Sequence, residues 1–326
     1  MELRDKIRLS LDESRMLILG AQILLGFQFR VVFEPGFEGL PPSSQYLKMI
    51  AMVILLGGIA LIMSPGSYHR IVRAGNDAED VQEFATTVMD FALVPFLLAL
   101  SIEFYVSTGR FFGASGGLME GAFIGVAALA LWYGLGVVAR PALRRKAIQK
   151  EKQEGRVHAQ RTSLKDKIDQ ALTEARVVLP GAQALLGFQL VTIFMDGFDK
   201  LPNSSKYIHM VSLTLMALTM VFLMTPAAFH RIAANGEESE RVQKVASTFL
   251  IVAMIALPLG ISGDVYILFL KVTRSVLASR AVAGAVLIFF YALWFGYTSY
   301  RRMKIRRNQQ SKEEQNAKRR QGQIHR

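Results

Sequence analysis

Long apolar runs, separated by short polar stretches, dominate the pattern along this chain. Eight of these runs are long enough to cross a bilayer, which takes about 20 mostly apolar residues per helix. They cover residues 16–33, 47–65, 84–106, 118–139, 177–195, 208–226, 245–268 and 281–300. Because a backbone in lipid must satisfy its own hydrogen bonds, the pattern predicts membrane-spanning helices.

The pattern is written twice, with an offset of 161 residues. GAQILLGFQF at 20–29 corresponds to GAQALLGFQL at 181–190, and SPGSYHRI at 64–71 corresponds to TPAAFHRI at 225–232. With an even number of spans in each unit, both copies enter the membrane from the same side, so the repeat is parallel and not inverted. We therefore predict an all-α membrane protein with eight transmembrane helices, arranged as two parallel four-helix repeats.

Polar stretches set the predicted boundaries of the repeats. The first repeat covers 1–139 and the second covers 163–300, with a basic cytoplasmic linker at 140–162 and a basic cytoplasmic tail at 301–326. Before the first span of each repeat, an apolar residue recurs about once per helical turn. This spacing predicts a short amphipathic helix on the membrane surface that leads into the span.

Composition and charge limit which kinds of ligand and partner the chain can bind. The chain has 326 residues, 52% of them hydrophobic, a net charge of +12 and no cysteine, which excludes disulfides and thiolate metal sites. Most Lys and Arg residues lie in the termini, the linker and the loops between the second and third spans, which predicts that both termini are cytoplasmic. The linker and tail are expected to contact anionic lipid headgroups. They lack interleaved aromatic residues, so we expect no nucleic-acid binding, and the pattern leaves homo-oligomer formation open.

Glutamines inside the first span of each repeat are the first candidate polar residues. Gln22 corresponds to Gln183, and Gln28 corresponds to Gln189. An amide that faced lipid would lose its hydrogen bonds, so these side chains should face protein. We interpret them as packing residues near the seam between the halves, where small residues such as Gly26 allow close helix approach. The alternative is a polar pathway along the pair of first spans.

Acidic residues inside spans are the next candidates, because each costs about 2.5–3.5 kcal/mol to insert. Asp90 has no acidic counterpart, whereas Glu103 is matched by Asp264. We expect Arg30 to neutralise Glu103, and Asp264 to pair with Lys271 or to face water. Two interpretations remain: interfacial anchoring with one structural ion pair, or a carboxylate that binds protons or cations.

The motif Pro-x-x-aromatic-His-Arg-Ile ends the second apolar run of each repeat. It supplies His69 and Arg70 in the first repeat and His230 and Arg231 in the second. We expect proline to end or kink the helix and the arginines to anchor the membrane interface. Histidine titrates near neutral pH, so a proton or cation site is the alternative. A metal site is the least favoured reading, and we expect no metal and no cofactor.

Apparent enzyme signatures do not fit their required context. Residues 113–117 match G-x-S-x-G, but that motif works at a strand–turn–helix elbow, whereas here it falls in a predicted flexible loop between two spans. We therefore expect no enzymatic activity.

The Glu-x-Arg sequence before the GAQ-x-LLGFQ span, followed by Pro-x-x-Tyr/Phe-His-Arg, carries a family resemblance. It resembles an uncharacterised bacterial family of small four-span membrane proteins, a domain of unknown function, some of whose members are labelled sodium:proton antiporters. This chain resembles two such units in tandem, most clearly over the first two spans of each half. The resemblance implies a helical bundle in the bacterial cytoplasmic (inner) membrane and brings no substrate or catalytic residue.

Two functional classes follow. The first is a non-enzymatic structural or regulatory membrane module. The alternative is a small secondary transporter for protons or monovalent cations, which would use Glu103 and Asp264 together with His69 and His230.

Overall fold

The computed structural model describes residues 3–74, 76, 78–134, 164–232, 240–308 and 310–311. The first half contains α1 (Leu3–Val31), α2 (Pro35–Glu38), α3 (Pro42–Arg73), α4 (Glu79–Leu129) and the π-helical turn η1 (Ala130–Gly134); the second contains α6 (Leu164–Thr192), α7 (Asp196–Asp199), α8 (Asn203–Ile232), α9 (Glu240–Thr273), α10 (Val276–Tyr291) and the π-helical turn η2 (Ala292–Tyr297). The described residues form no strand, so the all-α prediction is confirmed for them. The predicted linker and most of the tail lie outside the described residues.

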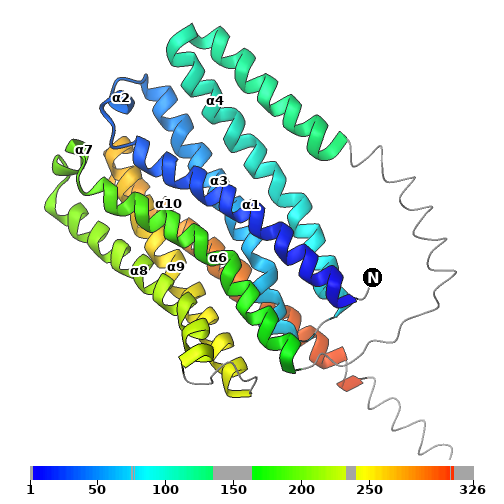
Figure 1. Ribbon diagram of the computed structural model, residues 1–326. Coiled ribbons are helices and arrows are strands. Elements are labelled where there is room, and N and C mark those ends of the chain that lie inside the picture. Colours follow the sequence, from blue (N-terminus) through cyan, green and yellow to red (C-terminus); the bar gives the residue numbers. More distant parts are fainter. Residues whose placement is uncertain are drawn as a thin grey trace, which may run out of the picture.

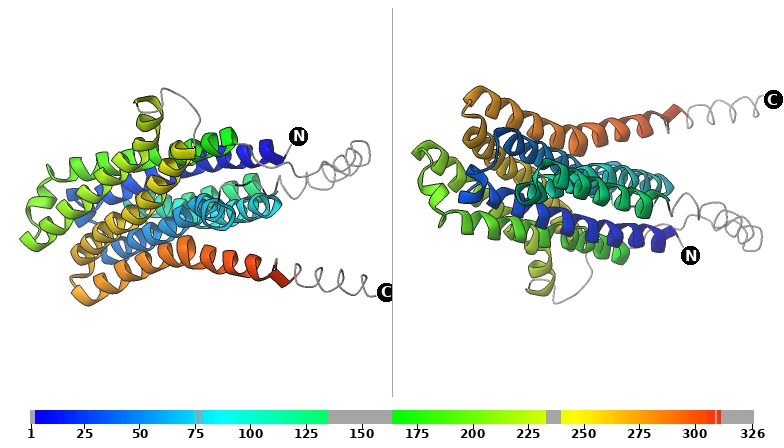
Figure 2. Two further views of the ribbon diagram at one scale, coloured as in Figure 1. Left: turned by 90° about the horizontal axis from the view of Figure 1, so that it is seen from below. Right: turned by 90° about the horizontal axis from the view of Figure 1, so that it is seen from above.

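The long helices run roughly side by side in one elongated bundle (Figure 1). The short helices α2 and α7 lie at one end, and the N-terminus and the start of α6 lie at the other. Figure 2 shows the C-terminal part of the chain leaving from that same end. Within each half, the first three long helices pack against one another in the same order, α1, α3 and α4 in the first and α6, α8 and α9 in the second.

Five described helical segments are long and apolar enough to cross a membrane, by length and composition. They are Pro42–Arg73, Glu79–Gly134, Asn203–Phe229, Glu240–Thr273 and Val276–Asn308. Two shorter apolar stretches, Leu17–Val31 and Val178–Thr192, belong to α1 and α6. All eight predicted runs fall wholly or largely on these helices, and two of them share the segment that contains α4.

A single break divides α4 into two antiparallel arms (Figure 1). Gly113 has φ 76° and ψ 179°, a conformation that side chains with a Cβ atom rarely adopt. The arms approach closely because Gly117 and Gly121 face the first arm. A Cβ atom at Gly117 would overlap the Tyr105 carbonyl oxygen, and one at Gly121 would lie 2.7 Å from that of Ser101. The predicted flexible loop at 113–117 is therefore wrong, because helix resumes directly after one glycine.

Replacing Gly117 by valine is expected to force the two arms of α4 apart and to destabilise the protein by about 1–3 kcal/mol, the usual cost of overpacking. Thermal unfolding in detergent would measure the loss. Gly20→Val is the matched control, because a Cβ atom added at Gly20 would meet no atom of a packed neighbour within 4 Å. Equal stability of wild type and Gly117→Val would contradict the close packing.

Two further local predictions need correction. Pro65 and Pro226 lie inside α3 and α8, and these helices continue to Arg73 and Ile232, so proline ends neither of them and a kink is the alternative that remains. The predicted surface helices are also not separate elements, because α1 and α6 each run without a break from the amphipathic stretch into the apolar stretch. In all four helices the helical backbone continues, past the proline in α3 and α8 and past the transition from amphipathic to apolar sequence in α1 and α6.

Candidate functional site

The helices α1 and α6 form the seam between the two halves. Gln22 on α1 is fully buried, and a Cβ atom added at Gly181 on α6 would overlap its amide. Gly26 packs in the same way against the Phe188 ring. Gln22 therefore lies at the seam, but its amide atoms are buried without a hydrogen-bond partner among the described residues, so the expected hydrogen bond across the interface is not formed there. Its counterpart Gln183 is exposed, so the expectation that both amides face protein is wrong for the second copy.

The second glutamine position belongs to a buried cluster, the first polar triad, which consists of Gln28, Lys48 and Glu103. These residues come from α1, α3 and α4. Gln28 Nε2 donates to Glu103 Oε1 at 3.0 Å, and Lys48 Nζ donates to Glu103 Oε2 at 2.5 Å. The Lys48 and Glu103 side chains are 8% and 13% exposed. The carboxylate is thus neutralised and hydrogen-bonded within its own half.

The second half carries an equivalent cluster, the second polar triad, which consists of Gln189, His209 and Asp264. Its members lie on α6, α8 and α9, at the positions that correspond to the first triad. Gln189 Nε2 donates to Asp264 Oδ2. His209 Nδ1 lies 3.2 Å from Asp264 Oδ1, and its Nε2 lies 3.1 Å from the backbone carbonyl oxygen of Gln189. All three residues are buried.

These triads correct the predicted partners of the repeated acids. Arg30 contacts Glu34 at 3.2 Å and not Glu103, and Lys271 contacts Glu38 at 3.0 Å and not Asp264. The position of a residue in the sequence indicates its depth along a helix, but ion pairing also depends on rotation about each helix axis. The missed residues are Lys48 and His209. A signal for them existed, because the repeat offset places two basic side chains at one position in the second apolar helix of each half.

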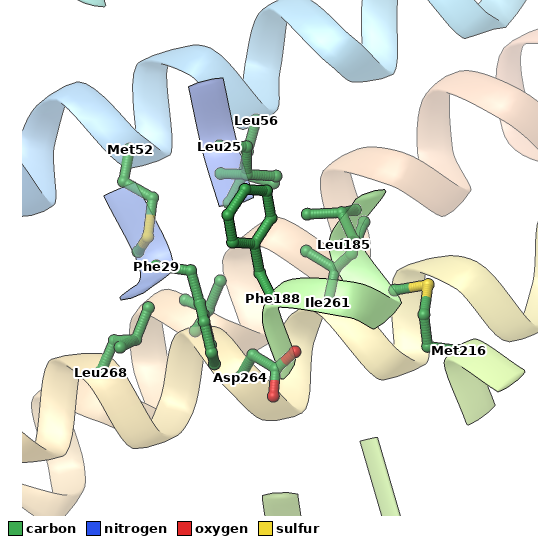
Figure 3. Close-up of a pocket in the computed structure, with 11 residues that line it drawn as sticks. Leu25, Phe29, Met52, Leu56, Leu185, Phe188, Met216, Ile261, Asp264 and Leu268 are labelled. Atoms are coloured by element: carbon green, nitrogen blue, oxygen red, sulfur yellow. The ribbon is translucent and has the colours of Figure 1, made fainter. Parts of the chain in front are cut away.

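The second triad also lies at the seam. The Phe29 ring of α1 stacks on His209 at 5.9 Å between ring centroids, and Phe198 contacts the same imidazole edge-on at 5.1 Å. Asp264 borders a cavity of about 20 Å³ whose other lining residues are apolar and come from both halves (Figure 3). A cavity of this size accommodates about one water molecule.

The remaining candidates do not join the triads. Asp90 lies on an exposed part of α4, where the Tyr133 hydroxyl donates to its backbone oxygen at 2.6 Å. His69 is buried near the opposite end of α3 from Lys48. Among the described residues, no group of three or more His, Cys, Asp or Glu side chains suits a metal ion. The side chains of His230 and Arg231 lie outside the described part of the chain.

Arg70, the expected interface anchor of the first repeat, packs against the other half of the protein. It is buried, and its Nη1 donates to Ser247 Oγ on α9 at 2.9 Å, so it links the two halves. The neighbouring Tyr68 is also buried, and its hydroxyl donates to Asp80 Oδ2 at 3.0 Å. The first Tyr-His-Arg motif therefore packs inward, because acceptors on α4 and α9 face it.

Another polar contact joins the halves at the end that carries α2 and α7. Glu38 lies between Lys271 Nζ at 3.0 Å and Lys200 Nζ at 3.7 Å. The hydrogen bond and positive charge of Lys271 hold the pKa of the Glu38 carboxyl below its ordinary value.

Replacing Lys271 by methionine is expected to lower stability slightly at neutral pH, by no more than about 0.5 kcal/mol because the Glu38 carboxylate is half-exposed and screened by solvent. Since the folded-state pKa of Glu38 is lowered, its contribution is present above the ordinary pKa of 4.5 and is lost as the pH falls through the lowered value. Unfolding midpoints of both proteins between about pH 3 and pH 7 should therefore converge in acid. A difference that grows in acid would contradict this sign.

Together, these long apolar helices make the chain an all-helical protein over its described residues, with a composition compatible with a membrane protein. Within that class, the chain belongs to a family of unknown function, DUF6328, whose model matches residues 6–136 and again residues 158–298. Two matches in one chain are consistent with a tandem duplication. No curated protein and no solved structure matches the chain. These comparisons give no support to the sodium:proton antiporter label.

Proposed function

We propose that the chain is a multi-pass protein of the bacterial inner membrane that acts as a non-enzymatic structural or regulatory module. It has eight transmembrane helices in two parallel four-helix repeats, with both termini in the cytoplasm. Its basic linker and tail contact anionic headgroups. The apolar helices, the double family match and the distribution of Lys and Arg support this proposal.

The two polar triads carry the functional part of the proposal. In each half, a glutamine, a basic side chain and an acid come from three different long helices and meet in a buried cluster. A partnered polar cluster in an apolar interior penalises any other helix arrangement, because sliding or rotating one helix leaves a buried charge without its partner. The triads therefore act as clamps that fix the packing of each half.

Single-cysteine labelling tests the topology, because the native chain has no cysteine. Glu38→Cys should react with a membrane-impermeant thiol reagent in intact cells, because Glu38 lies at the end that we assign to the outside. Asn76→Cys, on the loop between α3 and α4, should react only after the membrane is opened. The reverse pattern would contradict the proposed orientation, and labelling of both in intact cells would contradict the spanning helices.

A small secondary transporter for protons or monovalent cations is the second candidate function. One observation favours it: Asp264 borders a cavity between the halves. The small volume and apolar lining of that cavity favour the module instead, since known carriers place their sites in broken helices near the bilayer midplane.

Proteoliposomes that contain the purified protein are expected to show no pH-driven or sodium-driven flux above empty vesicles. A fluorescent reporter of internal pH would measure it. If flux appears, Glu103→Gln and Asp264→Asn identify its origin: loss of flux in either variant would establish the transporter and overturn the module. Unchanged flux in both variants would place the pathway elsewhere and would also overturn the module.

A further inference from the structure

The two polar triads occupy equivalent positions but differ in their basic member. Lys48 holds Glu103 in the first, and His209 holds Asp264 in the second. A lysine beside a carboxylate keeps its charge across the neutral range, whereas histidine is the side chain that ordinarily changes charge between about pH 5 and pH 8. The same arrangement of helices therefore holds a lysine–carboxylate pair in one half and a histidine–carboxylate pair in the other.

The contacts of His209 require more protons than a neutral ring and a charged carboxylate possess. Its Nε2 lies 3.1 Å from the backbone carbonyl oxygen of Gln189, and its Nδ1 lies 3.2 Å from Asp264 Oδ1. A carbonyl oxygen only accepts, so the first contact needs a proton on Nε2. A neutral imidazole has only one N–H group. The second contact then needs a further proton, carried by Nδ1 or by the carboxyl group.

We infer that His209 and Asp264 form a binding site for one exchangeable proton at the seam between the halves, and that the first triad has no such site near neutral pH. The bound proton lies between Nδ1 and Oδ1. When it leaves to solvent, either the ring lone pair faces the carboxylate or the other lone pair faces the Gln189 carbonyl. In either case a nitrogen lone pair faces an oxygen lone pair and the two repel, so release of the proton loosens α8 against α6 and α9.

Apart from Asp264, the groups described around His209 are neutral, so gain or loss of this proton is what changes the charge near the ring. Asp264 on α9 is the charged group that faces the ring; α6 contributes Gln189, whose carbonyl oxygen and amide are neutral. The rings of Phe29 from α1 and Phe198 from α7 cover the imidazole. Since Phe29 belongs to the first half, a positive ring can interact with its face and transmit the proton state across the seam. This inference concerns regulation of the proposed module and rests on that function for its membrane setting.

Reciprocal exchange of the two triads tests the inference. His209→Lys with Asp264→Glu rebuilds the first triad in the second half, and Lys48→His with Glu103→Asp does the reverse. Unfolding midpoints would be measured in neutral-lipid nanodiscs between about pH 5.5 and pH 8.5. We expect wild-type stability to fall as the pH rises, the first exchange to remove this dependence, and the second exchange to add a further dependence of similar size.

Proton counting provides an independent readout. Potentiometric titration of the purified protein should show that wild type releases about one proton more than the first exchange variant over the same pH range, against a background of the other histidines. If that variant does not fold, Asp264→Asn, which removes the titratable carboxyl group, should flatten the stability profile instead.

Equal pH profiles and equal proton counts in wild type and these variants would overturn the inference. Its failure is separable from failure of the proposed function, because topology labelling and ion flux are measured without reference to this proton. A proton site without flux leaves the module intact, whereas flux with no titration at this site would overturn both.

Discussion

Lys48→Met is expected to destabilise the protein by about 3–5 kcal/mol at neutral pH, because it leaves the Glu103 carboxylate buried without its cation. The carboxylate would keep one hydrogen bond, from Gln28 Nε2 at 3.0 Å. Charged side chains in an apolar interior are stable only when paired. Thermal or denaturant unfolding in detergent measures the loss.

Two controls separate charge from packing in this experiment. Lys200→Met removes a lysine whose side chain is 68% exposed and should cost less than about 0.5 kcal/mol. The double variant Lys48→Met with Glu103→Gln removes both charges and should recover most of the stability, because no unpaired charge remains. If the double variant is as unstable as Lys48→Met, the triad contributes through shape and not through charge pairing.

Trp294→Ala has the second large expected effect, about 3 kcal/mol, near the lower end for a buried tryptophan because lipid replaces part of the lost packing. Trp294 is fully buried, packs edge-on against Phe290, and donates from Nε1 to the Ala60 carbonyl oxygen at 2.8 Å. It thereby fastens the fourth helix of the second half to α3 of the first. Unfolding in detergent would measure the loss.

The matched control is Tyr133→Ala, because Tyr133 occupies the position equivalent to Trp294 in the first half. Tyr133 is only partly buried and donates to a backbone oxygen within its own half. Its removal should cost less than about 1.5 kcal/mol, the ordinary net worth of one hydrogen bond. Equal losses for both variants would show that Trp294 does not hold the halves together.

The difference between these two positions reflects the fourth helices as a whole. In the first half, Gly117 and Gly121 let the second arm of α4 fold closely against the first arm. The second half has Ala278 and Val282 at those positions, and its fourth helix contacts α3 as well as α9. As a result Ala60 is buried, while its equivalent on α8, Val221, is 57% exposed. The two halves therefore differ in how the fourth helix packs, and this difference goes with larger side chains at two positions of the second half.

Hydropathy and the internal repeat were enough to predict the helices and to single out the two acids that join the triads. Apolar runs of this length predict helices, because a backbone that crosses lipid must satisfy its own hydrogen bonds. Glu103 and Asp264 stood out because each is a charged residue inside an apolar run and recurs at the repeat offset. Gln28 and Gln189 were predicted to face protein for a related reason, and both are buried.

Only the tertiary structure decided which groups meet. Hydropathy varies along the helix axis, but partners depend on rotation about that axis and on where helices cross. Lys48 therefore forms an ion pair with Glu103, while Arg30 forms one with Glu34 near the end of α1. The same limit applies to Gln22 and Gln183, which share one sequence position but differ in burial, because one faces a glycine on the opposing helix at the seam and the other does not.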